Sequence, residues 1–219
     1  MKHCEALGIS NSSNLILCFP GSDQKDVDET LRNLEFTLPF RPLKMVYFWL
    51  GLGSPVWRHP EKFGIEAVFN HRNYAGIFPL EIFKSMQFTI QSYRGGLVHQ
   101  RKLWTPVKKK LKAWEKTYDE LHRGSRHENI LSFSDGREFL IIHQKRIQGG
   151  HLTHRLEGTS RGIYLFCREH RSLKRILERF TAVGSDKVVP FLRMMVDKKL
   201  MFEENNKYLS LAVPANPNS

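Results

Sequence analysis

The sequence predicts an α/β protein that begins with the last strands and helices of a partial (β/α) barrel and ends in a winged-helix-like α+β module. Near its start, a buried strand, a Pro-Gly turn and an amphipathic helix follow one another. Near its end, three helices precede a hairpin. A parallel strand needs parallel neighbours, and few residues precede the first one. We therefore expect the chain to be the tail of a larger α/β domain.

Composition limits the classes of protein to consider. The 219 residues allow one large or two small domains, and 41% hydrophobic residues suffice for packed cores. A net charge of +12 favours acidic partners, although many proteins carry such a charge without one. Three scattered cysteines indicate free thiols in a reducing compartment. With no signal region and no membrane-length apolar run, we expect a cytoplasmic protein and no membrane partner.

Residues 1–57 are predicted to form the C-terminal part of a βα barrel. A short helix over residues 1–7 ends at Gly8, and an apolar strand follows over residues 14–19. An amphipathic helix is predicted over residues 26–34, and a second apolar strand over residues 43–52. Two such strands joined by a helix predict a right-handed parallel crossover.

Residues 58–124 are predicted to form a helical extension, whose first part is irregular and aromatic. Thr105 and Pro106 fit an N-cap and a first helical position, so a long helix is expected over residues 105–123, with Gly124 as its C-cap. Its exposed face is rich in lysine. This basic helix either forms a solvated face or binds an acidic peptide or nucleic acid.

Residues 125–158 are predicted to form a β-hairpin and a linker. Two apolar runs over residues 129–143 flank Asp135 and Gly136, a strong signal for a type I′ turn. The polar, glycine-containing stretch over residues 144–158 is predicted to be the linker.

Residues 159–214 have the order of elements of a winged helix, in which three helices precede a hairpin. The first helix is predicted over residues 159–169, the second begins at Ser172, and the third begins at residue 185 or 186. The third helix is mostly apolar, and the wing tip carries Glu203 and Glu204, which would repel phosphate. Nucleic acid is therefore the disfavoured partner. Docking of a peptide by addition of an edge strand fits this module better.

Few residues carry a signal for chemistry. His151 and His154 form an H-x-x-H pair without a third ligand nearby, so no metal site is predicted. Cys18 lies at a strand end, where ligands bind in α/β sheets, but we expect it to pack as a small hydrophobic residue. No catalytic triad or P-loop is present, and no catalytic residue is assigned.

The order of three segments resembles the radical S-adenosylmethionine enzymes. Residues 1–21, with NLILCFPG at their end, resemble a late segment of the radical core, where a helix ending LG leads to a strand reading roughly NLLYGFPGE. Residues 48–65, with SPVWRHPEKFG, resemble the next strand and the SPYFERPEEFG stretch. Residues 154–214 resemble the C-terminal region of the subgroup that matures ribosomally made peptides and usually carries an N-terminal cobalamin-binding domain.

The resemblance implies a binding site for S-adenosylmethionine. Phe19, Pro20 and Gly21 would border the adenine, Asn14 would lie further back, and Ser54 would face the same cavity. The chain departs from the family where Cys18 replaces the usual Gly, and where Ser-Asp after Gly21 replaces an acidic residue and Thr.

The larger departure is the absence of the C-x-x-x-C-x-x-C motif, whose thiolates bind the family's 4Fe–4S cluster. The earlier barrel strands and the cobalamin domain are also missing. The resemblance therefore implies a C-terminal portion of a peptide-modifying enzyme, with carbon methylation of a ribosomal precursor peptide as the parent reaction. Alone, this chain is predicted to be catalytically silent. Its expected partner is the precursor peptide or the missing N-terminal half.

Two alternatives stay open. The chain is a non-enzymatic module that binds a peptide or nucleic acid with the basic helix over residues 105–123 and the winged helix, or it is a remnant without function. Phosphate binding weakens steeply with salt, which separates the first alternative from the enzyme hypothesis. An exposed edge on a half-barrel would make a remnant prone to aggregation.

Overall fold

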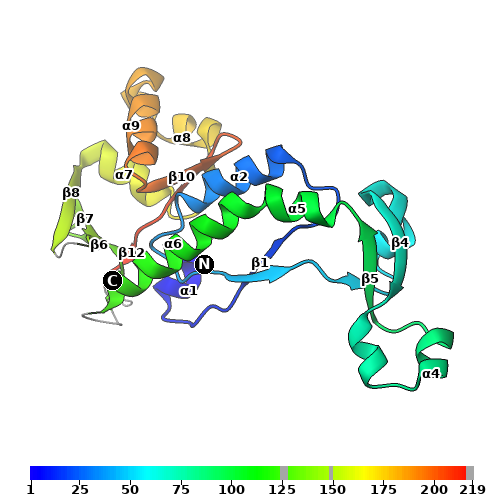
Figure 1. The fold of residues 1–219 in the computed structure, drawn as a ribbon. Helices are drawn as coiled ribbons and strands as arrows, with labels where there is room; N and C mark the ends of the chain where they lie inside the picture. Colours follow the sequence, from blue (N-terminus) through cyan, green and yellow to red (C-terminus); the bar gives the residue numbers. More distant parts are fainter. Residues whose placement is uncertain (124–127, 148–149, 216–219) are drawn as a thin grey trace. The chain divides into compact units, whose positions relative to one another are not determined.

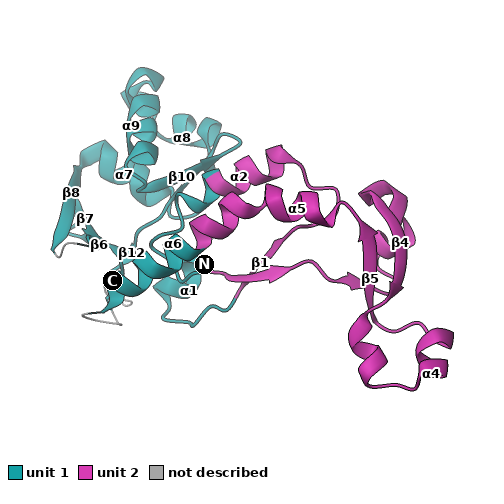
Figure 2. Ribbon diagram, viewed as in Figure 1, with its two compact units in different colours: residues 1–12, 32–42, 112–219 teal, residues 13–31, 43–111 magenta. Residues whose placement is uncertain are grey.

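The computed structural model of the chain describes residues 1–123, 128–147 and 150–215 (Figure 1). This part of the chain is a mixed α/β protein with nine α-helices and several small sheets, none of which closes into a barrel. The predicted α/β class is therefore confirmed. The chain divides into two compact units (Figure 2). Unit 1 comprises residues 1–12, 32–42 and 112–219, and unit 2 comprises residues 13–31 and 43–111.

A two-stranded parallel sheet opens unit 2. Strand β1 (Asn14–Leu17) pairs in parallel with β2 (Lys44–Tyr47), and helix α2 (Gln24–Leu34) lies between them in the chain. The parallel pair predicted from the two apolar runs is confirmed. The second run, however, is divided, because β2 ends at Tyr47 and β3 (Leu50–Gly51) joins a different sheet.

The second sheet of unit 2 corrects the prediction of a helical extension. Strands β4 (Ile65–Asn70) and β5 (Ile90–Gly95) pair antiparallel, and β3 pairs with the other edge of β5. Their aromatic and branched residues lie opposite one another, as Val68 does to Tyr93. Such pairs stabilise a sheet but leave little periodic signal in strands this short. The aromatic stretch was therefore wrongly predicted to be without strands.

Helices occupy the rest of this region. The long helix α6 begins at Thr105 as predicted, but Thr105 is not its N-cap, because it is already helical and its hydroxyl donates to the Arg101 carbonyl at 2.9 Å. The buried face of α6 includes Val107, Leu111 and Trp114. The predicted C-cap Gly124 lies outside the described residues. The helices and 3₁₀ helices between β3 and the end of α6 are α3 (Pro55–Arg58), η1 (Pro60–Phe63), η2 (Arg72–Gly76), α4 (Leu80–Ser85), α5 (Leu97–Leu103) and α6 (Thr105–His122).

Unit 1 contains a four-stranded sheet in the order β12-β6-β7-β8, and the short helix α1 (Lys2–Ala6) belongs to the same unit. Its strands are β6 (Leu131–Asp135), β7 (Phe139–Lys145), β8 (His151–Glu157) and β12 (Val213–Pro214). The predicted hairpin is confirmed, but the type I′ turn is wrong, because residues 136–138 separate the strands and Arg137 has φ 69°.

The predicted linker over residues 144–158 is also wrong, because it contains β8. Leu152 and Leu156 lie two pleats apart on one side of this strand, and the residues between them are polar. Alternation with a period of two is typical of a half-buried strand. The stretch was predicted to be a linker because its histidines and glycines made it look polar and irregular.

The end of the chain has the predicted sequence of three helices and a hairpin. Its elements are α7 (Gly158–Phe166), β9 (Arg171–Ser172), α8 (Leu173–Arg179), η3 (Thr181–Val183), α9 (Ser185–Asp197), β10 (Met201–Glu204) and β11 (Lys207–Ser210). Ser172 caps α8 as predicted, since its Oγ accepts the Arg175 N–H at 3.3 Å. Strand β9 was not predicted, and it completes a sheet in the order β10-β11-β9.

The core of unit 1 joins this module to the four-stranded sheet. Tyr164 of α7 is fully buried, and its hydroxyl donates to the Leu200 carbonyl at 3.1 Å and accepts the Ala212 N–H at 3.2 Å. Leu140 and Leu192 belong to the same cluster and are fully buried. None of the helices that the structure describes combines the length and the apolar character needed to cross a membrane.

Candidate functional site

The carboxyl ends of β1 and β2 are the strongest location for a ligand in unit 2, because ligands of open α/β sheets bind at this end of the strands. After β1 the chain turns through Cys18 (φ 59°) and Gly21 (φ 83°). The Phe19 carbonyl accepts both the N–H and the hydroxyl of Ser22, at 3.1 and 2.8 Å, which closes the turn. The backbone at Cys18 is in the left-handed region, which glycine adopts without strain.

Aromatic rings connect the two strand ends. The ring of Phe19 lies edge-on to Phe48, which follows β2, with 4.9 Å between centroids, and to Phe63 at 5.9 Å. Phe48 in turn lies 6.2 Å from Tyr93 of β5. Edge-to-face pairs of this kind favour a fixed geometry. They place a rigid apolar surface beside the turn.

A cavity of about 210 Å³ lies beside Pro20 and Gly21. One of its walls is Gln100 of α5, whose side chain is buried, donating to the Ser22 carbonyl at 2.7 Å and accepting from the Trp104 indole at 3.2 Å. These bonds fix the amide against the turn. The lining residues are Pro20, Gly21, Lys62, Phe63, Gly64, Tyr93, Gly96, Leu97 and Gln100.

A second cavity, of about 250 Å³, lies at the end of β2, and it shares Tyr93 and Leu97 with the first. Trp49 and Arg101 are also among its lining residues. Each hollow is smaller than the roughly 300–1,000 Å³ of a pocket for a whole drug-sized ligand. Each can therefore hold a fragment such as a heterocyclic base or a short side chain.

The charges around these cavities are positive. Burial raises the pKa of the Cys18 thiol, while the nearby Arg101 and Lys108 act in the opposite direction. Burial likewise raises the pKa of Tyr93, so both groups are neutral at physiological pH. Lys62 lines the first cavity. The site can accordingly accept an apolar ring and attract an anionic group such as a carboxylate.

The residues predicted to bind the cofactor are only partly brought together. Pro20 and Gly21 line the first cavity, and Phe19 is adjacent with 38% of its surface exposed. Asn14 lies at the other end of β1, opposite Lys44. Ser54 caps α3, its Oγ accepting the Trp57 N–H at 3.2 Å, and it lines neither cavity.

Three residues of the site, Tyr93, Leu97 and Gln100, were not predicted from the sequence. They lie more than 70 residues beyond the turn, in β5 and α5, and reach it through tertiary pairing. The one available signal was the Gly-Gly pair at 95 and 96, where Gly95 allows the end of β5 to lie close to the backbone at Gly64. A Cβ at Gly95 would lie 2.5 Å from the Gly64 carbonyl oxygen.

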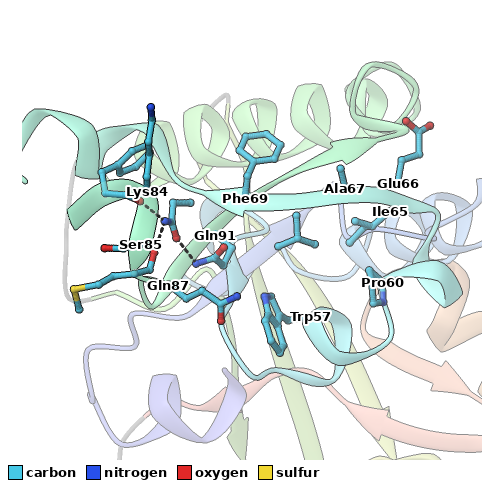
Figure 3. A pocket seen from close by; sticks show the side chains of 14 residues that line it. Trp57, Pro60, Ile65, Glu66, Ala67, Phe69, Lys84, Ser85, Gln87 and Gln91 are labelled. Atoms are coloured by element: carbon cyan, nitrogen blue, oxygen red, sulfur yellow. Dashed lines mark hydrogen bonds between the residues drawn. The ribbon is translucent and has the colours of Figure 1, made fainter. Parts of the chain in front are cut away.

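A larger cavity in unit 2, of about 720 Å³, lies over β4 and is lined by residues including Trp57, Phe69 and Gln91 (Figure 3). Its central polar groups bond to each other. Asn70 donates to the carbonyls of Phe83 and Met86 at 2.9 and 2.6 Å, and the Gln91 amide donates to Asn70 Oδ1 at 3.0 Å (Figure 3). These bonds hold the α4 segment against the sheet, which is a structural role.

The residues present do not fit an iron–sulfur cluster. Cys18 belongs to unit 2 and is buried, whereas Cys4 and the buried Cys167 belong to unit 1. Within residues 1–123, 128–147 and 150–215, no three His, Cys, Asp or Glu side chains converge as a metal ion would require. His151 instead lies 3.3 Å from a carboxylate oxygen of Glu128.

Comparison with known proteins found no counterpart. No protein-family model, no curated protein and no solved structure matches this chain.

Proposed function

We propose that this chain is the C-terminal portion of a radical S-adenosylmethionine enzyme that modifies a ribosomal precursor peptide, and that the carboxyl ends of β1 and β2 bind the adenosyl part of S-adenosylmethionine. The winged-helix-like module of unit 1 would dock the peptide or another domain. Carbon methylation is the parent reaction that the sequence resemblance implies.

The open parallel sheet carries this proposal. Among the described residues, β2 is the sole strand paired with β1, and β1 is the sole strand paired with β2. Parallel sheets are normally covered on both faces and extend to further strands. Ile16, in the middle of β1, nevertheless has 51% of its surface exposed. A sheet of this kind suits a protein that is completed by further strands.

The backbone at Cys18 supports the resemblance independently. The related strands have Gly at this position, and the φ of 59° here is a conformation that favours Gly. The same turn geometry therefore accounts for the family's residue, although this chain carries a cysteine.

The two cavities suit part of the cofactor. Pro20, Gly21 and Tyr93 offer apolar and aromatic surface to an adenine ring, and Lys62 or Arg101 would attract the methionine carboxylate. Their limited volumes mean that a completing partner would supply the remaining contacts. The chain's cysteines do not suit the cluster, so we assign the chain binding and orientation, and no catalytic step.

The experiment is saturation-transfer NMR with adenosine and S-adenosylmethionine as probes, because this method detects weak binding. Leu97 lines both cavities, so the larger side chain of Leu97→Trp should occupy their space and abolish the saturation-transfer signal of both probes. Val98→Trp is the matched control, since Val98 is the next residue of α5, is 67% exposed and lines neither cavity. No signal with the unmodified chain, or equal signals in both variants, would refute the assigned site.

Two further measurements test the enzyme hypothesis. The purified chain, incubated with a strong reductant, should leave S-adenosylmethionine intact, so reductive cleavage would contradict its catalytic silence. Sequencing the DNA upstream of the Met1 codon tests the origin of the missing half. A frame that encodes the C-x-x-x-C-x-x-C motif and earlier strands is expected.

A binding module remains the second candidate, favoured by the exposed lysines of α6. Lys109 and Lys110 are exposed, while the Lys108 ammonium donates to the Tyr47 hydroxyl at 3.3 Å. The test is the affinity of the chain for a single-stranded oligonucleotide at about 50 and about 200 mM salt. A steep fall in affinity over this range is usual for phosphate contacts and would favour this candidate. Salt-insensitive adenosine binding would favour the enzyme hypothesis.

A further inference from the structure

Unit 1 contains a cavity of about 400 Å³ that the proposed function does not use. It is formed by α1, the end of α7 with the residues that follow it, and the segment that includes β12. The lining residues are Lys2, His3, Ala6, Leu165, Phe166, Arg168, Glu169, Arg171, Ala212 and Pro214. The volume is that of a site for a compact small molecule.

Cations predominate among the lining residues. Lys2, Arg168 and Arg171 contribute three positive charges, against the single carboxylate of Glu169, which leaves an excess of two when His3 is neutral. Glu169 is engaged by Arg171, with 2.6 Å between Oε2 and Nη2. The carboxylate cannot neutralise all three cations.

Hydrogen-bond donors are left over in the same place. The Nε of Arg171 is buried and has no hydrogen-bond partner, and its guanidinium lies 5.1 Å from the centre of the Phe166 ring. The Lys2 ammonium donates one bond, to the Arg168 carbonyl at 2.6 Å, and an ammonium has three hydrogens to donate. Buried donors normally have partners, so each one left over calls for an explanation.

The electrostatics agree with this geometry. Burial, followed by the charge of Arg168, lowers the pKa of Lys2 to about 8. A lysine in this state is poorly neutralised by its surroundings. A bound anion would supply the missing charge and acceptors for the remaining hydrogens of the Lys2 ammonium.

The other walls are apolar, because Ala6, Leu165, Phe166, Ala212 and Pro214 present no charged group. The cavity therefore offers a cationic end and an apolar body. We propose that it binds a small phosphate monoester with a compact apolar group. A phosphate monoester carries close to two negative charges at neutral pH, which matches the excess of two, whereas a carboxylate carries one.

The test is calorimetric titration of the full chain at pH 7.5 and constant ionic strength, using phenyl phosphate, inorganic phosphate and benzoate. Phenyl phosphate should bind most tightly, and inorganic phosphate more weakly because it leaves the apolar walls uncovered. Arg171→Gln should weaken phenyl phosphate at least tenfold. Arg175→Gln is the matched control, since Arg175 is exposed on α8 and does not line the cavity.

A second variant guards against misfolding, because Arg171 lies in β9. Lys2→Gln removes a cation from α1 and should also weaken phenyl phosphate at least tenfold, with an unchanged circular dichroism spectrum. Equal losses in Arg175→Gln, or benzoate binding as tight as phenyl phosphate, would overturn the proposal. These variants are in unit 1, so their failure leaves the adenosine test in unit 2 unaffected.

Discussion

The two units differ in how they bury apolar side chains. In unit 1, nineteen buried residues belong to one hydrophobic cluster. In unit 2, nine hydrophobic residues are buried among the described residues, and the cluster around the β3-β5-β4 sheet contains three of them, Leu50, Val56 and Ile65. Of the fifteen large hydrophobic side chains that are exposed among the described residues, eleven belong to unit 2, although it is the smaller unit.

This difference indicates which unit needs a covering surface. Single exposed hydrophobic residues are normal on proteins, but a concentration of them in one region is typical of an interface. Unit 1 contains four of the fifteen exposed large hydrophobic side chains of the described residues. In unit 2, Ile16, Tyr47 and Trp49 are exposed on the two parallel strands or directly after them. The comparison therefore supports completion of unit 2 by further strands.

The largest effect is expected in the core of unit 1. Leu192→Ala removes a fully buried side chain from α9 and should lower the free energy of unfolding by about 2–5 kcal/mol. Urea denaturation followed by circular dichroism measures this loss. Met194→Ala on the same helix is the control, because Met194 is 40% exposed. It should cost under about 1 kcal/mol, and equal losses would mean that α9 is not packed as described.

The next effect tests the left-handed backbone after β1 in unit 2. Cys18→Val places a β-branched residue at φ 59° and should destabilise the protein by about 1–3 kcal/mol. Cys18→Gly removes the steric penalty and should be tolerated better, even though it leaves a small void. Thermal unfolding compares the two variants. A more stable Val variant would contradict the left-handed conformation.

A smaller, pH-dependent effect is expected in unit 1. Two hydrogen bonds of 2.7 Å from Arg161 hold the pKa of Asp135 below its usual range. Because the folded pKa is the lower one, the pair stabilises the protein above about pH 3.9, the unfolded value. That stabilisation is lost as the pH falls through the folded pKa. Asp135→Asn keeps an acceptor for the Arg137 N–H but should flatten the acid limb of a stability–pH curve.

Local patterns predicted the elements that depend on neighbours in the sequence. The Pro-Gly turn, the Thr105 start of α6 and the Ser172 cap are determined within a few residues, and they occur where expected. Strand β9 depends on a partner far along the chain, namely β11, and was missed. Strand β8 pairs with the preceding strand β7 and was missed because its residues are mostly polar. A two-residue strand such as β9 has no short-range signal of its own, and a polar strand such as β8 has a weak one.

The candidate site was predicted to the same partial extent. Its first half, Pro20 and Gly21, follows a strand whose apolar run is plain in the sequence. Its second half, Tyr93, Leu97 and Gln100, is brought there by the β4–β5 hairpin, in a region for which no strand was predicted. The left-handed backbone at Cys18 was not predicted, because that conformation usually indicates glycine.

The smallest effect on stability, and the most direct test of the comparison, is expected at Trp49. This side chain is 71% exposed, so Trp49→Ser should change the free energy of unfolding by less than about 0.5 kcal/mol. It should nevertheless lower the binding of a fluorescent hydrophobic dye, because it removes apolar surface from the exposed end of β2. Phe48→Ser is the counterpart, since Phe48 is packed edge-on against Phe19 and Tyr93. It should destabilise the protein and increase dye binding. If Trp49→Ser instead destabilised the protein as much, Trp49 would already be packed, and unit 2 would not need a partner to cover it.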